Sequence, residues 1–218
     1  AIRNELQRKH VQRSVMCTLT QTLVDTSRPE KEQQLSAIGP WYDRERAEKY
    51  RTTRKWKMIE EPGRGYRRGV PALPPLDVIE LDSIKQLVDS GTIVISGGGG
   101  GIPVTADANG NLSGIEAVVG TEQISNMFAQ RLNAKIMIMV VETATKYIMA
   151  HLSIEKGSRL MLQELDKFLK DESIKSRTVQ AQLLAASEFL HDGGEQVIIT
   201  TLEKLPATLK NKGGLWIG

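Results

Sequence analysis

Thr92-Ile93-Val94-Ile95-Ser96-Gly97-Gly98-Gly99-Gly100-Gly101-Ile102-Pro103-Val104 is the stretch of sequence from which the fold can be inferred. A short run of β-branched residues is typical of a buried strand, and this run ends in consecutive glycines. Glycine tolerates positive φ and allows another group to approach the backbone closely. In open α/β sheets, ligands bind outside the carboxyl ends of the strands. A flexible linker is the alternative, but the stiff, apolar Ile-Pro-Val that follows argues against it.

The glycine stretch matches neither of the two standard phosphate-binding loops. A P-loop ends in Gly-Lys-Ser/Thr, and no lysine follows Gly101. A dinucleotide fingerprint has its last glycine at the start of a helix, whereas Pro103 and Val104 favour extended chain. Backbone N–H groups that line a small anion site are the interpretation that remains.

Composition indicates an ordinary globular protein. The chain has 218 residues, of which 40% are hydrophobic and 25% are charged, with a net charge of +3. No apolar run approaches the roughly 20 residues that span a bilayer, so no membrane partner is expected. The single cysteine, Cys17, fits a reducing, cytoplasmic compartment, and we expect a buried, inert thiol. Because Ile2 and Leu6 already follow a helical pattern, we also expect that sequence preceding Ala1 is absent here.

Residues 25–70 differ in character from the rest, since they are polar and rich in aromatic and charged side chains. We predict a small protruding subdomain with a short helix near Asp43–Tyr50 and a hairpin around Trp56 and Tyr66. Its basic residues raise the alternative of a nucleic-acid surface. Interleaved acidic residues favour a solvated surface of mixed charge instead, and no nucleic-acid partner is expected.

Strands and helices alternate along the remaining chain, which predicts a parallel sheet covered by helices on both faces. Asn109-Gly110 within Asp107–Asn111 is a strong hairpin signal. We expect the strands near 92–96, 135–141 and 196–201 to lie close together at the centre of the sheet. The predicted strands are 15–24, 92–96, 135–141 and 196–201, and the predicted helices are 1–10, 77–90 (capped by Gly91), 122–132, 157–190 (with a break near 172–177) and 201–209.

Five motifs occur in the order and at the spacing of a known family: Leu19–Asp25, Ile38–Tyr42, Gly63–Arg68, Gly98–Val104 and Gly114–Val118. In these motifs the chain resembles the carbamate kinases of the amino-acid kinase superfamily. The resemblance implies a three-layer αβα sandwich with a mainly parallel sheet and a small protruding subdomain. It also implies a homodimer that transfers a phosphoryl group between ATP and carbamate, giving carbamoyl phosphate and ADP.

The resemblance also implies roles for particular residues. On the family pattern, the phosphoryl group lies against Gly98, Gly99, Gly100 and Gly101, with Arg64 and Arg67 nearby, and the nucleotide lies against Glu142, Tyr147 and Lys175. The cofactor is ATP or ADP with Mg²⁺, its binding weak or lost, and no residue is assigned as a metal ligand. The same pattern divides the chain into the end of an N-terminal lobe (1–24), the subdomain (25–70) and a nucleotide-binding lobe (71–218).

Structural roles are the alternative for some of these residues. Arg64 and Arg67 could instead pair with Glu60 or Glu61 inside the subdomain. Glu142 could instead cap the helix that follows its strand.

The chain departs from the family pattern where lysines are expected. Those positions hold Ser36, Pro74, Thr121 and Gln182, and the family's Gly-Gly-Asn loop is not in this sequence. Phosphoryl transfer depends on cations around the transferred group, so we expect impaired activity. A catalytically inactive homologue that acts as a binding or assembly partner is the second hypothesis.

Overall fold

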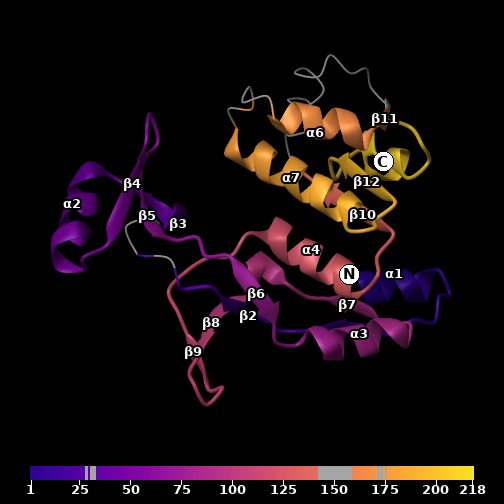
Figure 1. Ribbon diagram of the computed structural model, residues 1–218, viewed down its shortest axis with the longest axis horizontal. Helices are drawn as coiled ribbons and strands as arrows, with labels where there is room; N and C mark the ends of the chain where they lie inside the picture. The colour runs from indigo at the N-terminus through magenta and orange to yellow at the C-terminus, as the bar shows by residue number, and fades with distance from the viewer. Residues whose placement is uncertain (28, 30–32, 142–158, 171–173, 175) are drawn as a thin grey trace. The chain divides into compact units, whose positions relative to one another are not determined.

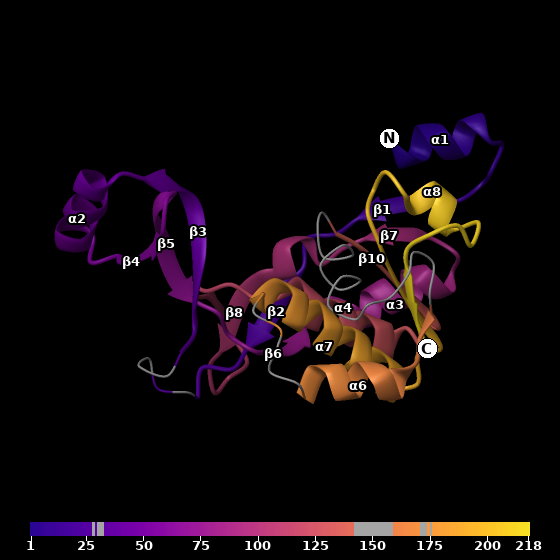
Figure 2. The ribbon, with the colours of Figure 1, turned by 90° about the horizontal axis from the view of Figure 1, so that it is seen from above.

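The computed structural model describes residues 1–27, 29, 33–141, 159–170, 174 and 176–218. The chain divides into two compact units, residues 1–124 and residues 125–218. Figures 1 and 2 show the elements of each unit from two directions. Among the residues that the structure describes, every helix is too short or too polar to span a bilayer.

The described residues of the first unit form three separate sheets. Strands β1 and β7 pair in parallel; β6, β2, β8 and β9 form a second sheet, in which β2 and β8 are parallel; and β3, β5 and β4 form an antiparallel third. Helix α2 packs against the third sheet (Figures 1 and 2). The elements are α1 (Ile2–Arg8), β1 (Val15–Cys17), β2 (Gln21–Val24), β3 (Leu35–Tyr42), α2 (Arg44–Thr53), β4 (Lys57–Glu61), β5 (Gly65–Pro71), β6 (Pro75–Val78), α3 (Leu81–Asp89), β7 (Ile93–Ile95), the 3₁₀ turn η2 (Gly98–Gly100), β8 (Ile102–Ala106) and β9 (Leu112–Gly114).

In the second unit the described residues form one sheet, with α7 packed against β12 and α6 packed beside α7 (Figure 1). Its strand order is β10-β12-β13-β11, with β10 and β12 parallel. Leu165, Leu183, Val197 and Ile199 are fully buried in its core. The elements are β10 (Ile136–Val140), β11 (Arg159–Leu160), α6 (Leu162–Lys170), α7 (Arg177–His191), β12 (Gln196–Thr200), α8 (Leu205–Thr208) and β13 (Leu215–Ile217), and α4 (Thr121–Arg131) spans the boundary between the units.

A polar contact fastens α6 to α7. The Ser187 hydroxyl donates to Oδ1 of Asp166 at 2.7 Å, and Nε2 of His191 lies 3.0 Å from Oδ2 of the same carboxylate. These two contacts, that with Ser187 first, lower the pKa of Asp166 below its usual value. The ionised carboxylate therefore stabilises the packing of the two helices.

Most expected elements are present, and the α/β class with its parallel strand pairs is confirmed. The pairing of β10 with β12 is also confirmed, as are helix α2 and the β4–β5 hairpin. Residues 92–96, however, pair with β1 in the first unit and not with β10 or β12. Strand β10 lies at the end of its sheet, not at its centre, and within the described residues it pairs with β12 alone.

Several boundaries differ from expectation because tertiary pairing overrides local pattern. Residues 15–24 form two strands in different sheets, since β1 pairs with β7 whereas β2 pairs with β6 and β8. Residues 75–78 are strand, so the helix expected from Asp77 begins at Leu81. Residues 159–160 are also strand, and the closing helix is reduced to α8.

Cys17 is exposed, which corrects the expectation of a buried thiol. It ends β1, whose sheet has only one other strand among the described residues, β7. That small sheet leaves the thiol uncovered.

Candidate phosphoryl-binding site

The glycine loop between β7 and β8 adopts a conformation that glycine alone adopts readily. Gly97 (φ +68°, ψ +16°) and Gly99 (φ +67°, ψ +20°) are left-handed, while Gly98 between them is not. Alternation of left- and right-handed residues turns successive N–H groups toward one concave side, which is the geometry of an anion-binding nest. The loop therefore has the backbone form predicted from its sequence.

The consecutive glycines serve two different purposes. A Cβ on Gly100 would lie 2.2 Å from the carbonyl oxygen of Val119, and a Cβ on Gly101 would lie 2.3 Å from Oγ1 of Thr22. These two glycines are needed for close packing. A Cβ on Gly98 or Gly99 would meet no atom within 4 Å, so that half of the loop faces open space.

The same half of the loop presents free amides. The amide of Gly97 donates to Oγ1 of Thr20 at 2.9 Å, and those of Gly100 and Gly101 donate to carbonyls within the loop. Within the described part of the chain, the amides of Gly98 and Gly99 have no hydrogen-bond acceptor. Two adjacent N–H groups beside open space can bind an oxyanion such as a phosphoryl group.

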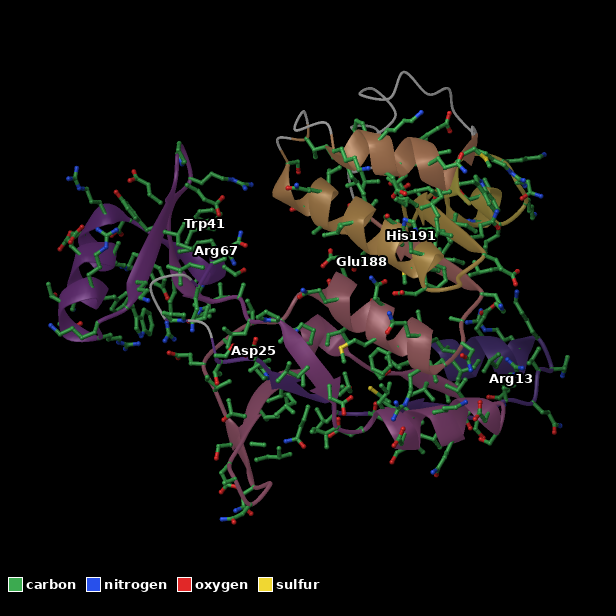
Figure 3. The ribbon with its side chains drawn as sticks, in the orientation of Figure 1. Arg13, Asp25, Trp41, Arg67, Glu188 and His191 are labelled. Carbon is green, nitrogen blue, oxygen red and sulfur yellow. The ribbon has the colours of Figure 1, made fainter. Side chains whose placement is uncertain are left out.

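Arg64 and Arg67 meet at one aromatic ring. Each guanidinium carbon lies 5.3 Å from the centre of the Trp41 ring, and Trp41 is 41% exposed. Figure 3 labels Trp41 and Arg67, which lie side by side. Nε of Arg67 donates to the carbonyl of Gly39 at 3.1 Å, within the irregular part of β3 between Ile38 and Tyr42. A bulge of this kind re-aims a side chain, here Trp41.

The structural alternative for these arginines holds in part. Nη1 of Arg64 lies 3.8 Å from Oε2 of Glu61, at a distance and exposure where an ion pair contributes little. Arg67 contacts Gly39 and Trp41, and no ion pair is recorded for it in the described chain. Its terminal amines can therefore bind a further acceptor.

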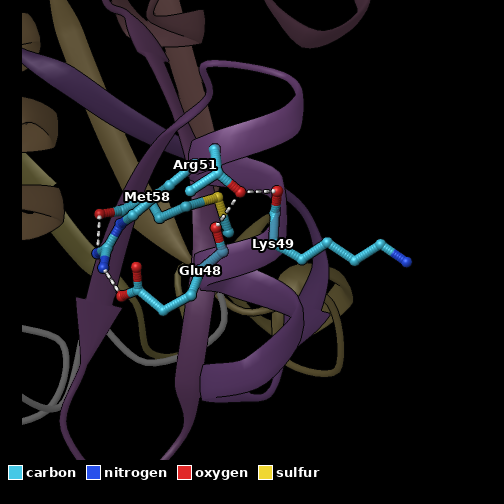
Figure 4. Close-up of polar contacts among 5 residues, drawn as sticks. Glu48, Lys49, Arg51 and Met58 are labelled. Carbon is cyan, nitrogen blue, oxygen red and sulfur yellow. Dashed lines mark hydrogen bonds and ion pairs between the residues drawn. The ribbon is translucent and has the colours of Figure 1, made fainter.

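Two other arginines of the subdomain, Arg51 and Arg68, contribute to its packing. Arg51 binds the carboxylate of Glu48 and the carbonyl of Met58, which ties α2 to β4 (Figure 4). Arg68 stacks on Trp56 at 4.2 Å and pairs with Glu116. These contacts favour a folded scaffold over a nucleic-acid surface.

The structure does not join all the expected site residues. Among the described residues, no hydrogen bond or ion pair connects Arg64 or Arg67 with the glycine loop. Glu142, Tyr147 and Lys175 lie outside the described residues. Within residues 1–27, 29, 33–141, 159–170, 174 and 176–218, no group of three or more His, Cys, Asp or Glu side chains could hold a metal ion.

Sequence inspection missed the residues that hold the loop. Thr20 and Thr22 both bond to it, and Trp41 brings the two arginines together. The alternation of threonines at 18, 20 and 22 is the signal that could have identified the first two, because alternate strand residues share one face.

Known proteins that are longer than this chain resemble it along nearly all of its length. Carbamate kinase of Pyrococcus horikoshii is 34% identical over 215 residues, which is 98% of this chain and 68% of that protein. Giardia lamblia carbamate kinase bound to AMP-PNP superimposes with a TM-score of 0.79 at 26% identity, over 98% of this chain and 68% of that one. A protein of Aeropyrum pernix K1 gives a TM-score of 0.83 at 27% identity, over 99% and 70%.

No family model matches the chain. The chain spans about two thirds of the length of the relatives it matches. Identity above 30%, coverage of 98% and the shared fold agree with the motifs at the glycine loop and in the subdomain. The chain therefore belongs to the carbamate kinase family.

Proposed function

We propose that this carbamate kinase-like protein binds the phosphoryl group of carbamoyl phosphate at the amides of Gly98 and Gly99. The observation that supports this most directly is the pair of amides without acceptors beside open space. Gly100 and Gly101 give the loop its shape. Arg64 and Arg67 supply positive charge, since guanidinium groups bind phosphate oxygens in a bidentate manner.

An adenine nucleotide is the proposed second ligand, with Glu142, Tyr147 and Lys175 as its expected contacts. The Giardia homologue was solved with AMP-PNP, which supports this choice. We expect weak binding, because residues 177–182 form the first turns of α7 and lack the glycines and the lysine of the family loop. Within the described residues no group of three or more His, Cys, Asp or Glu side chains could hold a metal ion, and Mg²⁺ in phosphotransferases takes several of its ligands from the nucleotide phosphates and from water.

Phosphoryl transfer is proposed to be slow or absent in this chain alone. Of the four positions where the family has lysine, Gln182 is only 9% exposed on α7, and its buried Oε1 atom has no hydrogen-bond partner among the described residues. Pro74, Ser36 and Thr121 carry no charge either. Loss of one electrostatic clamp costs about 10²–10³ in rate, so the combined losses are expected to cost about 10⁴ or more.

A coupled assay of ATP formation from carbamoyl phosphate and ADP tests this proposal, with Gly98→Asp as the control variant. Asp fits sterically at residue 98 and places a carboxylate where the phosphoryl group would bind. We expect no turnover above that of the variant. Turnover of about 1–100 s⁻¹, the range usual for kinases, that disappears in Gly98→Asp would show that the catalytic set is intact.

A direct titration tests binding separately from catalysis. The spectrum of ¹⁵N-glycine-labelled protein is recorded while carbamoyl phosphate is added. We expect shifts of the Gly98 and Gly99 amides in the wild-type protein and none in Gly98→Asp. Unshifted glycine signals at millimolar carbamoyl phosphate would refute the proposed site.

Association with another polypeptide is the second candidate function, and β10 favours it, because among the described residues this strand pairs with β12 alone. Ile136, Ile138 and Val140 are 54%, 43% and 48% exposed along this strand. Because alternate residues of a strand share one face, these side chains form an apolar face, and the unpaired backbone of an end strand is a template for pairing with another chain. We propose a homodimer, located in the cytoplasm, and light scattering after size-exclusion chromatography measures its mass; a monomeric mass would contradict it.

A further inference from the structure

Two buried threonines hold the glycine loop at both ends. Thr20 lies just before β2 and Thr22 lies within it, so their side chains share one face of the extended chain. Thr20 is 4% exposed and Thr22 is fully buried. Buried hydroxyl groups need partners, and both of these find them in the glycine loop.

The bonds fall on either side of the two free amides. Oγ1 of Thr20 accepts from the amide of Gly97 at 2.9 Å, and Oγ1 of Thr22 donates to the carbonyl of Gly100 at 2.8 Å. Gly98 and Gly99 lie between these two points and are not held by any side chain in the described structure. The threonines therefore fix the ends of the segment that faces open space.

The Thr20 bond also decides which amides are free. Because Thr20 occupies the Gly97 amide, an anion in the nest is left with the amides of Gly98 and Gly99. The close approach of Thr22 in turn requires glycine at residue 101, where a Cβ would lie 2.3 Å from the hydroxyl. The shape of the glycine loop and the positions of the two threonine hydroxyls therefore depend on each other.

Backbone bonds hold the same strands without the hydroxyls. The amide of Ile102 donates to the carbonyl of Thr20 at 2.7 Å, and β2 pairs in parallel with β8. Removal of a hydroxyl therefore leaves the sheet in place. Only the side-chain hydrogen bond between that threonine and the glycine loop is lost.

We propose that Thr20 and Thr22 are positioning residues, which hold the amides of Gly98 and Gly99 in the orientation that binds a phosphoryl oxygen. This inference rests on the proposed function of the loop. Neither threonine contacts the anion itself. Their effect is transmitted through Gly97 and Gly100, so it depends on the hydroxyl group and not on the size of the side chain.

The test compares Thr20→Val and Thr22→Val, which keep the shape and lose the hydroxyl, with Thr20→Ser and Thr22→Ser, which keep the hydroxyl. Two measurements use ¹⁵N-glycine-labelled protein at a temperature where every variant is folded. One is the hydrogen-exchange rate of the loop amides without ligand. The other is the dissociation constant for carbamoyl phosphate from the shifts of Gly98 and Gly99.

Each valine variant is expected to bind carbamoyl phosphate about tenfold more weakly, the equivalent of one hydrogen bond, while each serine variant stays within about threefold. Thr20→Val is also expected to speed exchange of the Gly97 amide about tenfold, and Thr20→Ser is not. A purely structural role would lower the unfolding temperature of the valine variants and leave their affinity unchanged when folded.

The two measurements separate the two ideas. Unchanged exchange at Gly97 in Thr20→Val, or unchanged affinity in both valine variants, would overturn the positioning role. If the wild-type protein binds no carbamoyl phosphate although exchange responds as expected, the proposed function fails, and the threonines hold the loop for a purpose other than binding this anion.

Discussion

Replacement of Gly100 by alanine is the substitution whose cost follows most directly from the structure. Gly100 has φ +89°, where a residue with a Cβ loses about 1–2 kcal/mol. The new Cβ would also lie 2.2 Å from the carbonyl oxygen of Val119. That oxygen belongs to backbone beside Val118, whose amide and carbonyl both bond to the chain at Pro71 and Leu73, so it cannot move aside freely. Overpacking of this kind costs about 1–3 kcal/mol, which brings the total to about 2–5 kcal/mol.

Gly98→Ala is the matched control for Gly100→Ala. Its Cβ meets no atom within 4 Å, and its φ lies outside the left-handed region. Its effect is expected to stay within about 1 kcal/mol, with stabilisation possible through the unfolded chain. Urea unfolding followed by circular dichroism measures both free energies of unfolding. In thermal unfolding, Gly100→Ala should lower Tm by about 4–20 °C. Wild-type stability in Gly100→Ala, or an equal loss in Gly98→Ala, would refute the steric division of the loop.

Three further substitutions test the packing outside the loop. Leu183→Ala removes a fully buried side chain of α7 and should cost about 2–5 kcal/mol in urea unfolding, whereas Leu184→Ala, at a position 48% exposed, should cost much less; equal losses would contradict the assigned core. Ser187→Ala removes the main cause of the lowered pKa of Asp166, so the difference in free energy of unfolding between wild type and variant should be full above pH about 4 and should shrink as the pH falls below that value. A difference that stays constant between pH about 2 and 7 would exclude this linkage. Asp43→Ala removes the N-cap bond to the amide of residue 46 and should destabilise α2 by about 0.5–2 kcal/mol by circular dichroism, whereas Asp43→Asn should largely retain it.

Elements with local signals were predictable from the sequence. Asp43 caps α2 through its own side chain, and the Asp107 carboxylate accepts from the amides of Asn109 and Asn111 in the hairpin turn. Gly110 supplies the positive φ that this turn requires. Capping and turn formation need only neighbours in sequence, so the sequence alone predicts them.

Elements that depend on distant partners were not predictable. Residues 75–78 carry an apolar pattern that also suits a helix, and only their pairing with β2 makes them a strand. The glycine run predicted an anion site, but the division between fitted and open glycines depends on Val119 and Thr22. The pairing of Arg64 and Arg67 at Trp41 likewise depends on the bulge in β3.

The exposed thiol of Cys17 makes the glycine loop accessible to spectroscopy. Cys17 is the only cysteine in the sequence, so a maleimide dye or a nitroxide attaches at one defined place without any mutation. The register partner of Cys17 in β7 is Ile95, which lies two residues before Gly97. Thr20 lies three residues after Cys17. A label there sits on the strand that leads into the threonine pair and opposite the strand that leads into the loop. Its signal would follow the ordering of the loop in real time when an anion is added.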